Sequence, residues 1–391
     1  VTRGYSDPEV GKVHSRALSV LERLDDPAAQ IQTLFNLWAF STAAAELAES
    51  AHLVTRMLEL AAGTENDELV LMMHCARART CFFYGEFAES ADSVRQVLTL
   101  YDPLRHGDLP RRYGQDEPGV IGQGVDSLRL WLQGFPAQAA TRVREACELA
   151  ERLDTPWGRA FAWAWLLLLL QLRGDAAELY RRAGDLHRLS AEQGFSIWIA
   201  WATFFEGWVA GARANEADGI TLMERGLDAW RGAGTHILEP YLLALLSETC
   251  LRAGRIDAAG ERLAEARAQV ERSGECWWEA ELHRLQGEVL LVAADDGGRD
   301  GDSSDRAEAC FHSALEVARR QQARSLELRA ALSLSRLWSR SRRDEARQLL
   351  SGVLETFTEG YDTADLRAAS EQMDRLARAG TSESQPRGRM T

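Results

Sequence analysis

The chain has 391 residues, of which 46% are hydrophobic, and its net charge is −14. An acidic surface cannot neutralise phosphates, so we expect no direct binding of nucleic acid. Its only lysine, Lys12, follows no glycine-rich loop and precedes no Ser or Thr, so the chain carries no P-loop.

Apolar content and cysteine spacing indicate the compartment. The longest apolar run, Ala160 to Leu172, is shorter than the roughly 20 residues that a membrane span needs, and we interpret it as a buried helix. The six cysteines form no C-x-x-C pair and are typical of reduced core residues. We predict a cytoplasmic protein without membrane contact. No signal peptide is evident, and the start at Val1 suggests a sequence taken from inside a longer protein.

The N-terminal third reads as helices joined by tight turns. Residues 1–30 are predicted to form one helix that leads into a solenoid, with a break at Asp25-Asp26-Pro27. The first hairpin is expected over 31–63, with a soft turn at 43–45. The second is expected over 68–101, turning at Gly85, since glycine readily takes the positive φ that ends a helix.

The segment 102–119 interrupts this pattern, because it is rich in Pro and Gly and lacks a helical period. Loops of this length are usually functional or disordered. Its polar and aromatic residues could recognise a partner or brace the loop against the solenoid, and the sequence leaves both hypotheses open. For recognition, we expect Arg105→Ala or Asp116→Ala to weaken partner binding without unfolding. The candidate residues are Asp102, Arg105, His106, Tyr113, Gln115 and Asp116.

From Val120 the pattern becomes a strict repeat with a period of about 40 residues, in the range of helical solenoids. The same helical-face position is occupied by Ala139, Leu179, Gly219 and Ala259, and the inner turns fall at Gly134, Gly174, Ala214 and Gly254. A fixed period with helix–turn–helix content is typical of a solenoid in which each repeat contacts its neighbours. We predict an all-α fold over residues 31–379: a right-handed α-solenoid of tetratricopeptide-like helical hairpins that repeat with this period.

The C-terminal third keeps the pattern with one insertion. Residues 294–305 are acidic and rich in Gly and Ser, and we expect them to replace a turn and to be mobile. They lack the Gly and the twelfth-position Glu of a calcium loop, and the eight histidines show no zinc spacing, so we expect neither a metal nor a cofactor. A hairpin is predicted over 325–360, then a capping helix to about 379 and a disordered tail over 380–391.

Twelve tryptophans are the most unusual feature of the composition, and many lie near the starts of first helices. They could line a groove for a partner or small ligand, or they could pack between repeats, as large aromatic residues at helical spacing mostly do. The candidates for a binding surface are Trp198, Trp201, Tyr241 and Trp277.

Several segments resemble a known family. The segments LYDPLRHGDLPRRYGQDEPGV, EQGFSIWIAWATFFEGW, EPYLLALLSETCLRAGRIDAAGERL and SGECWWEAELHRLQGEVLL are similar to the C-terminal tetratricopeptide-repeat region of large bacterial signalling ATPases. In those proteins a nucleotide-cyclase or a helix-turn-helix or winged-helix DNA-binding domain precedes a P-loop ATPase. The resemblance runs from about Gly4 to about Ala379. The loop departs from it by one extra residue at Glu117, and the insert at 294–305 is longer than the family's short turn.

The resemblance implies a non-enzymatic regulatory module that senses a protein partner or a small-molecule inducer. Its output would be the upstream ATPase domain of the same polypeptide, linked to cyclase activity or transcription regulation. One alternative is a free-standing scaffold that binds peptides or helices. Another is an α/α-toroid carbohydrate enzyme, which would need two carboxylates about 5 to 10 Å apart across a cleft.

Overall fold

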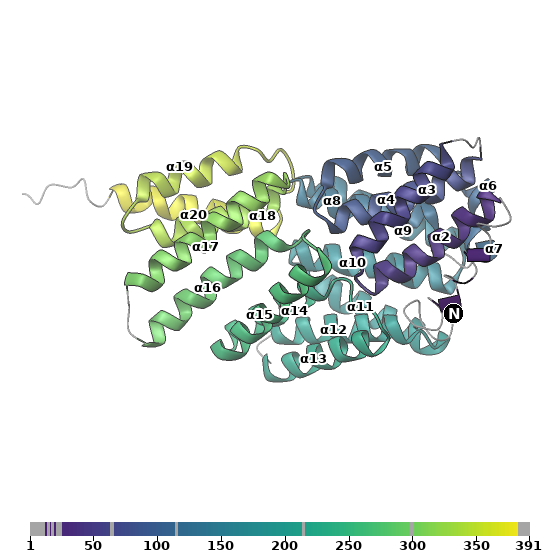
Figure 1. The fold of residues 1–391 in the computed structure, drawn as a ribbon. Helices are drawn as coiled ribbons and strands as arrows, with labels where there is room; N and C mark the ends of the chain where they lie inside the picture. The colour runs from purple at the N-terminus through teal and green to yellow at the C-terminus, as the bar shows by residue number, and fades with distance from the viewer. Residues whose placement is uncertain are drawn as a thin grey trace, which may run out of the picture. The chain divides into compact units, whose positions relative to one another are not determined.

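The computed structural model describes residues 12–13, 16, 19–20, 26–62, 66–113, 116–212, 216–297 and 301–381. Every regular element in these ranges is an α-helix (Figure 1). The chain divides into two compact units, unit 1 (residues 1–130 and 138–278) and unit 2 (residues 131–137 and 279–391). Most of the predicted helix over 1–30 lies outside the described residues. Pro27 begins the first complete helix, which Asp26 caps by accepting a hydrogen bond from the Ala29 N–H.

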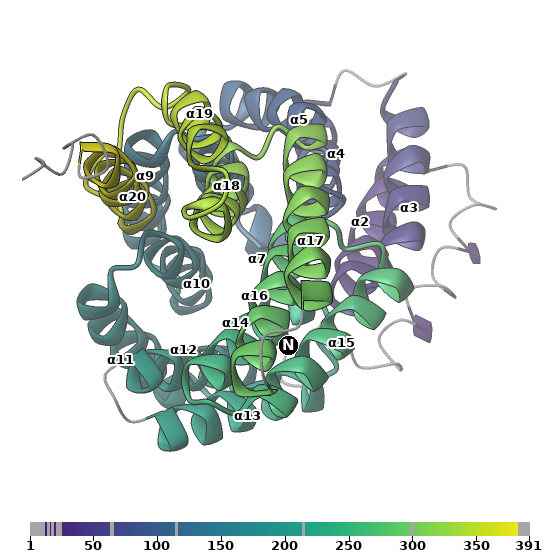
Figure 2. The same ribbon diagram turned by 90° about the vertical axis from the view of Figure 1, so that its left-hand side faces the viewer.

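Unit 1 is a series of helical hairpins, in which consecutive helices pack against each other. Its path can be followed in Figure 2 from the purple α2 through the teal α10 to α13. Its helices are α2 (Pro27–Ala43), α3 (Leu47–Ala61), α4 (Asp67–Phe83), α5 (Phe87–Leu100), α6 (Pro103–His106), α7 (Leu109–Tyr113), α8 (Pro118–Leu132, whose last two residues belong to unit 2), α9 (Pro136–Leu153, begun in unit 2), α10 (Pro156–Arg173), α11 (Ala176–Gln193), α12 (Ser196–Ala212), α13 (Glu216–Gly232), α14 (Glu239–Arg252) and α15 (Ile256–Ser273).

The predicted repeat is confirmed at three of its inner turns and on its buried faces, and the remaining predicted turn, Ala214, lies outside the described residues. Gly134, Gly174 and Gly254 have φ values of 89°, 75° and 69°, which glycine adopts without the clash that a Cβ would cause. Ala139 and Ala259, which share one register, are fully buried. The hairpins therefore follow directly from the period of the sequence repeat.

Two glycines explain why α12 and α13 pack so closely. A Cβ on Gly226 would lie 2.6 Å from the backbone nitrogen of Phe204, and one on Gly219 would lie 2.4 Å from that of Gly211. These two positions hold larger residues in the other repeats. Glycine allows the second helix to approach the backbone of α12, whose bulk is supplied by Trp and Phe.

The solenoid of unit 1 comes back into contact with itself. The backbone N–H groups of His236 and Ile237 donate to the carbonyl of Ala43, at 2.7 and 3.2 Å. In the same way, those of Cys276 and Trp277 donate to Phe83, at 2.9 and 3.2 Å. In each case the segment that closes one hairpin bonds the inner turn of a hairpin much earlier in the chain. We call these two contacts the seam.

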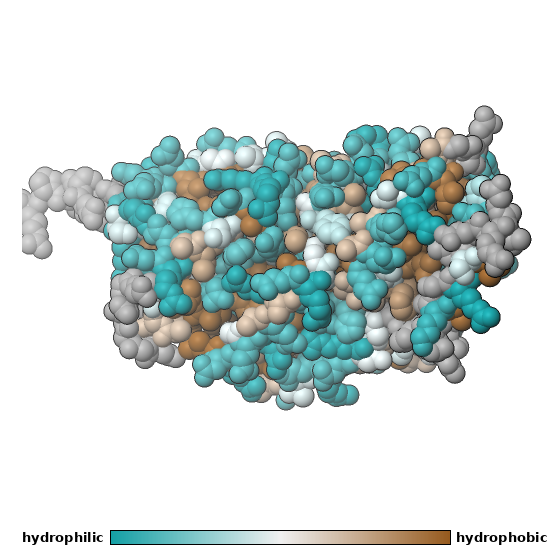
Figure 3. All heavy atoms as spheres, viewed as in Figure 1, coloured by the Kyte–Doolittle hydropathy of each residue, from teal (hydrophilic) through white to brown (hydrophobic). Residues whose placement is uncertain are grey.

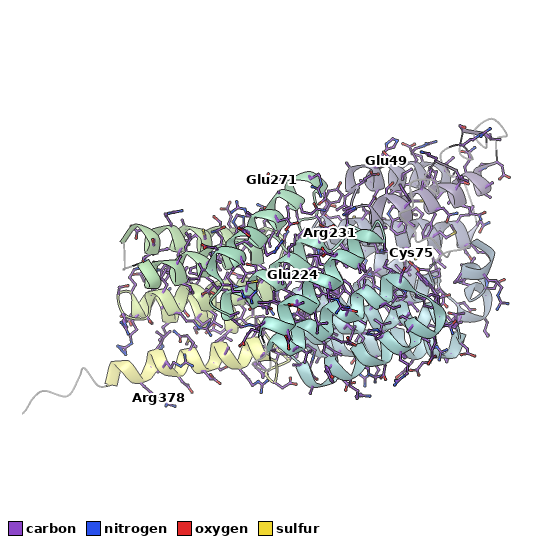
Figure 4. The ribbon with its side chains drawn as sticks, turned by 90° about the horizontal axis from the view of Figure 1, so that it is seen from below. Glu49, Cys75, Glu224, Arg231, Glu271 and Arg378 are labelled. Atoms are coloured by element: carbon purple, nitrogen blue, oxygen red, sulfur yellow. The ribbon has the colours of Figure 1, made fainter. Side chains whose placement is uncertain are left out.

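Partly buried ion pairs join the second helices. Figure 4 shows Glu224 and Arg231 on α13. Arg231 pairs with Glu265 on α15 at 2.7 Å, and Glu224 pairs with Arg262 of the same helix at 3.6 Å.

The molecular face in Figure 3 is largely hydrophilic, with hydrophobic residues in narrow strips. No helix in the described part of the chain is long and apolar enough to cross a membrane.

Unit 2 contains α16 (Glu279–Gly297), α17 (Gly301–Arg320), α18 (Arg324–Trp338), α19 (Arg343–Leu354) and α20 (Ala364–Thr381). Its core is built from residues such as Phe311, Leu334 and Leu350, all fully buried. The segment 131–137 belongs to this unit, and the carbonyl of Trp131 accepts a hydrogen bond from the Ser325 hydroxyl.

Two predicted irregular segments are more helical than the sequence suggested. Residues 102–119 contain α6, α7 and the start of α8. Asp102 caps α6 by accepting a hydrogen bond from the Leu104 N–H. In the acidic insert, α16 continues to Gly297 and α17 begins at Gly301, so the prediction of a replaced turn over 294–305 was too long. Acidic residues near a helix N-terminus favour helix, which accounts for the early start of α17. Residues 298–300 and the predicted tail from 382 onward lie outside the described residues.

Candidate functional site

A partly open cavity lies inside unit 1 and is lined mainly by the first helices of its hairpins. The volume of the cavity is about 80 Å³, enough to hold several water molecules or a small ligand. The lining residues are Ala39, Ala43, Arg79, Phe83, Asp116, Trp157, Phe161, Ala164, Trp165, Leu168, Ile197, Trp198, Trp201, Trp230, Thr235, Ile237 and Leu238.

The aromatic wall comes from the helical spacing of α10 and α12. Trp157, Phe161 and Trp165 recur every four residues and therefore share one face of α10. Trp198 of α12 packs against Trp157 and Phe161, with ring centroids 5.5 and 5.9 Å apart. On α8, a Cβ at Gly124 would lie 2.6 Å from the ring of Trp165, so this glycine makes room for the indole. The wall is thus a rigid set of rings from two adjacent hairpins.

One corner of the cavity is charged but internally paired. The Trp157 indole Nε1–H donates to Oδ1 of Asp116 at 2.8 Å, and Arg79 Nη1 lies 3.7 Å from the other carboxylate oxygen. The guanidinium of Arg79 also stacks over the rings of Trp38 and Phe161, at 5.3 and 5.9 Å from their centroids. Such stacking is favourable for a cation. The corner is therefore fixed in place and close to electrically neutral.

Two indole groups in the wall lack a hydrogen-bond acceptor. Trp165 and Trp198 are 5% and 6% exposed, and Nε1 of each has no partner among the described residues. The neighbouring rings differ: Trp201 donates to the carbonyl of Ala164 at 3.4 Å, and Trp230 to that of Ile237 at 3.1 Å. A buried unsatisfied donor costs about 1–3 kcal/mol. Both residues line the cavity, and neither donor is satisfied within the described part of the protein.

The segment 235–238 closes one side of the cavity and includes part of the seam. Leu238 has a φ of 69°, an unfavourable value for a non-glycine residue, and its N–H donates to both carboxylate oxygens of Glu275 at 3.1 and 3.0 Å. Trp277 Nε1 donates to the same carboxylate at 2.8 Å. Complete burial raises the pKa of Glu275 to about 8, outweighing these two donors. Glu275 thus holds the strained segment against the cavity.

The sequence-predicted residues separate into two groups. Asp116, Trp198 and Trp201 line the cavity. Asp102 caps α6, and its backbone N–H donates to Nδ1 of His106, which is fully buried. Arg105 is exposed and pairs with Asp67 at 3.4 Å. For Tyr113 the structure describes the backbone only, as the end of α7, and Gln115 lies outside the described residues.

Tyr241 and Trp277 do not line the cavity or the surface, so the prediction that they form part of a binding surface needs correction. Both are fully buried, with ring centroids 5.3 Å apart. The Tyr241 hydroxyl donates to Gln171 Oε1 at 2.7 Å, and Trp277 donates to Glu275. Their polar atoms are satisfied within the protein, which is typical of core residues.

The lining residues that were not among the predicted candidates include Arg79, Trp157, Trp165 and Trp230. The spacing of four between Trp157, Phe161 and Trp165 was a readable signal for a shared helix face. Nothing in the local sequence marks Arg79. Of the residues that line the cavity, Asp116 is the only acid. Within the described ranges, no cluster of three His, Cys, Asp or Glu residues could hold a metal ion.

Comparison with known proteins gives a fold and one distant relative. No family profile matches the chain. An uncharacterized protein of Rhizobium meliloti (strain 1021), R02095, is 28% identical over 274 residues, which is 68% of this chain and 25% of the relative. The chain therefore spans about a quarter of the length of this curated relative.

The similar solved structures share the architecture at low sequence identity. A Rap protein complexed with competence and sporulation factor has a TM-score of 0.55 at 11% identity, covering 90% of this chain and 98% of that one. A human IFIT1 dimer with m7Gppp-AAAA has 0.52 at 12% (94% and 76%), and the APC/C hetero-tetramer Cut9–Hcn1 has 0.51 at 13% (93% and 58%). These likenesses, with the observed hairpins, confirm an all-α, tetratricopeptide-like solenoid.

Proposed function

We propose that this chain is a non-enzymatic regulatory module that binds a small ligand inside unit 1 and controls the activity of a larger signalling protein. The observation that carries the proposal is the cavity, whose rigid aromatic wall holds two buried donors without acceptors. A buried donor without an acceptor costs about 1–3 kcal/mol, and an acceptor group on a ligand would recover that cost.

The geometry suggests how a ligand would act on the whole solenoid. The cavity is lined by α2 and α4 at one end of unit 1 and by segment 235–238 at the other. The seam joins the same two parts. A ligand that touched both would favour the closed seam over any opened form, by an amount equal to its difference in affinity for the two.

The signalling context rests on two supports. The segments quoted above resemble the repeat region of bacterial signalling ATPases, and the Rhizobium relative is about four times as long as its matched part. The output would then be a P-loop ATPase with a cyclase or DNA-binding domain. The Rap structure, a complex with competence and sporulation factor, offers a precedent for a regulatory ligand on this fold.

The two alternatives make different demands. A carbohydrate enzyme would need a pair of carboxylates in its cleft, whereas this cavity holds Asp116 alone, with both oxygens engaged by Trp157 and Arg79. A free-standing scaffold remains consistent with the fold. It becomes the better hypothesis if the natural reading frame encodes no further domain upstream.

The test uses the complete polypeptide encoded by the natural reading frame. Ala39→Phe would fill the cavity from a half-buried lining position on α2, and Ala217→Phe, on an exposed face of α13, is the matched control. We expect Ala39→Phe to change the rate of nucleotide hydrolysis and Ala217→Phe to leave it unaltered, with both variants folded by circular dichroism. Equal rates for both variants, or a frame without an ATPase, would contradict the regulatory role.

A further inference from the structure

We infer that the cavity of unit 1 binds an aromatic small molecule that carries a hydrogen-bond acceptor oxygen, as in an aromatic carboxylate or carboxamide. This inference rests on the proposed function and specifies its ligand. It depends on three properties of the cavity: the unsatisfied donors, the sign of the charge and the size.

The donors define the polar end of the ligand. Trp165 and Trp198 line the cavity, are more than nine-tenths buried, and have no acceptor for their Nε1–H groups in the described chain. An indole nitrogen can only donate. A ligand that satisfies both must therefore supply oxygen acceptors, and a carboxylate or amide oxygen does so with two lone pairs. Binding of such a ligand would recover the free energy that the two unsatisfied buried donors now cost.

The charges of the corner exclude a cationic ligand. Aromatic cages often bind quaternary ammonium groups, and Asp116 could seem to favour one here. However, Arg79 already stands over the ring of Phe161 and beside the Asp116 carboxylate. A second cation would meet the positive guanidinium at short range, and it would offer nothing to the indole donors. A neutral or anionic ligand has no such penalty.

The size limits the ligand to one or two rings. The cavity has a volume of about 80 Å³, room for several waters at roughly 10–15 Å³ each. A dinucleotide or a helix would not fit such a space. The rings of Trp157, Phe161 and Trp198 give flat apolar surfaces, against which an aromatic ring packs favourably.

The experiment compares four probes that share a benzyl group: phenylacetate, phenylacetamide, ethylbenzene and phenethylamine. The purified chain is titrated with each, and binding is followed by tryptophan fluorescence and calorimetry. We expect phenylacetate and phenylacetamide to bind at least about ten-fold tighter than the other two, a factor that corresponds to about 1.4 kcal/mol. This difference in binding free energy is close to the contribution expected from satisfying one buried donor.

Single substitutions identify the donors. Trp165→Phe and Trp198→Phe remove one N–H each while keeping an aromatic ring, and each should lower the affinity for phenylacetate about ten-fold. Trp208→Phe is a matched control, because Trp208 also has a buried Nε1 without an acceptor in the described residues but does not line the cavity. It should leave the affinity unchanged. Thermal unfolding of each variant confirms that it is folded, and Ala39→Phe should abolish binding by occupying the space.

The outcomes separate this inference from the proposed function. If phenethylamine bound more tightly than phenylacetate, the cavity would be a site for cations. If ethylbenzene bound as tightly as phenylacetate, the indole donors would have no role in binding. No binding by any probe, or unchanged affinity in both tryptophan variants, would also overturn the ligand class. If Ala39→Phe still alters nucleotide hydrolysis in the complete polypeptide, the regulatory function survives that result. If the probes bind and hydrolysis does not respond, the ligand class survives alone.

Discussion

Both units bury polar groups, but the cavity of unit 1 is lined by two indoles without acceptors in the described chain, whereas the charges around Glu281 in unit 2 are paired with one another. In unit 1, Trp165 and Trp198 line the cavity, and their indole nitrogens have no acceptor among the described residues. In unit 2, Glu281 accepts from Arg284 at 2.7 and 3.0 Å and from Arg329 at 3.4 Å, and Arg329 also donates to Asp365 at 2.8 Å. The two units thus use buried polar groups differently.

The network of unit 2 is electrostatically matched. Burial alone would raise the pKa of Glu281, but the two guanidinium groups beside it outweigh that effect and hold the pKa below its usual range. Burial would likewise lower the pKa of Arg329, yet Asp365 and Glu281 raise it. Each charge has its counter-charge within the protein, so the network has no capacity left for a ligand. The cavity of unit 1 still has unsatisfied donors among its described residues. We therefore propose that unit 1 binds the ligand and that the network of unit 2 stabilises the fold.

The largest effect we predict is for Glu281→Ala, which tests the structural half of this comparison. The substitution leaves Arg284 and Arg329 buried without their shared acceptor, and removing one partner of a buried pair costs about 3–5 kcal/mol. Urea unfolding should show this loss of free energy of unfolding. Binding of phenylacetate to the folded variant should not change.

Glu178→Ala on α11 is the control for that prediction. Glu178 pairs with Arg181, whose side chain is 58% exposed, and exposed pairs contribute about 0–1 kcal/mol. A comparable loss in both variants would mean that burial of the Glu281 network adds nothing, and the contrast between the two units would fail.

A smaller effect is expected from pH, through Glu275 beside the cavity. Its pKa is raised from about 4.5 to about 8 by burial, so the folded state keeps a proton that the unfolded state has lost. The stabilisation is complete below about pH 4.5 and is lost as the pH rises towards 8. Glu117, whose pKa burial raises to about 7, acts with the same sign. Stability should therefore fall between pH 6 and pH 8, by at most about 1.4 kcal/mol per pH unit for each group.

Glu275→Gln provides the check. Glutamine can still accept from Leu238 or Trp277 but does not ionise, so the variant should lose less stability than the parent chain between pH 6 and pH 8. Urea unfolding at several pH values measures this slope. An identical slope in both proteins would show that Glu275 does not carry the proton. A rise in stability with pH would contradict the sign of the effect for both acids.

The sequence predicted the repeat well because its signals are local. Turn glycines such as Gly174 and Gly254, and buried positions that recur with the period of the repeat, specify each hairpin without reference to the rest of the chain. The acidic insert was misjudged because its charge suggested a mobile turn, whereas acidic residues also suit the start of a helix such as α17.

The site could be predicted only in part because it depends on contacts between distant repeats. Trp198 and Trp277 look alike in the sequence, and their roles differ because Glu275 supplies an acceptor to Trp277 and nothing described supplies one to Trp198. Similarly, Arg79 reaches Asp116 only because of the way the hairpins curve. The period of the sequence repeat does not specify how the hairpins curve.

The smallest effect we predict concerns Arg105, and it separates two residues that the sequence placed together in one loop. The side chain of Arg105 is 63% exposed and that of its partner Asp67 is 48% exposed, so Arg105→Ala should change the free energy of unfolding by less than about 1 kcal/mol. It should not alter phenylacetate binding, because Arg105 does not line the cavity. Asp116→Ala is the comparison: it leaves the Trp157 indole without its acceptor and should cost about 1–3 kcal/mol. If Arg105→Ala instead abolished binding of the ligand or of a partner, the exposed loop around α6 would be the binding site, and the proposal that the cavity is the site would be wrong.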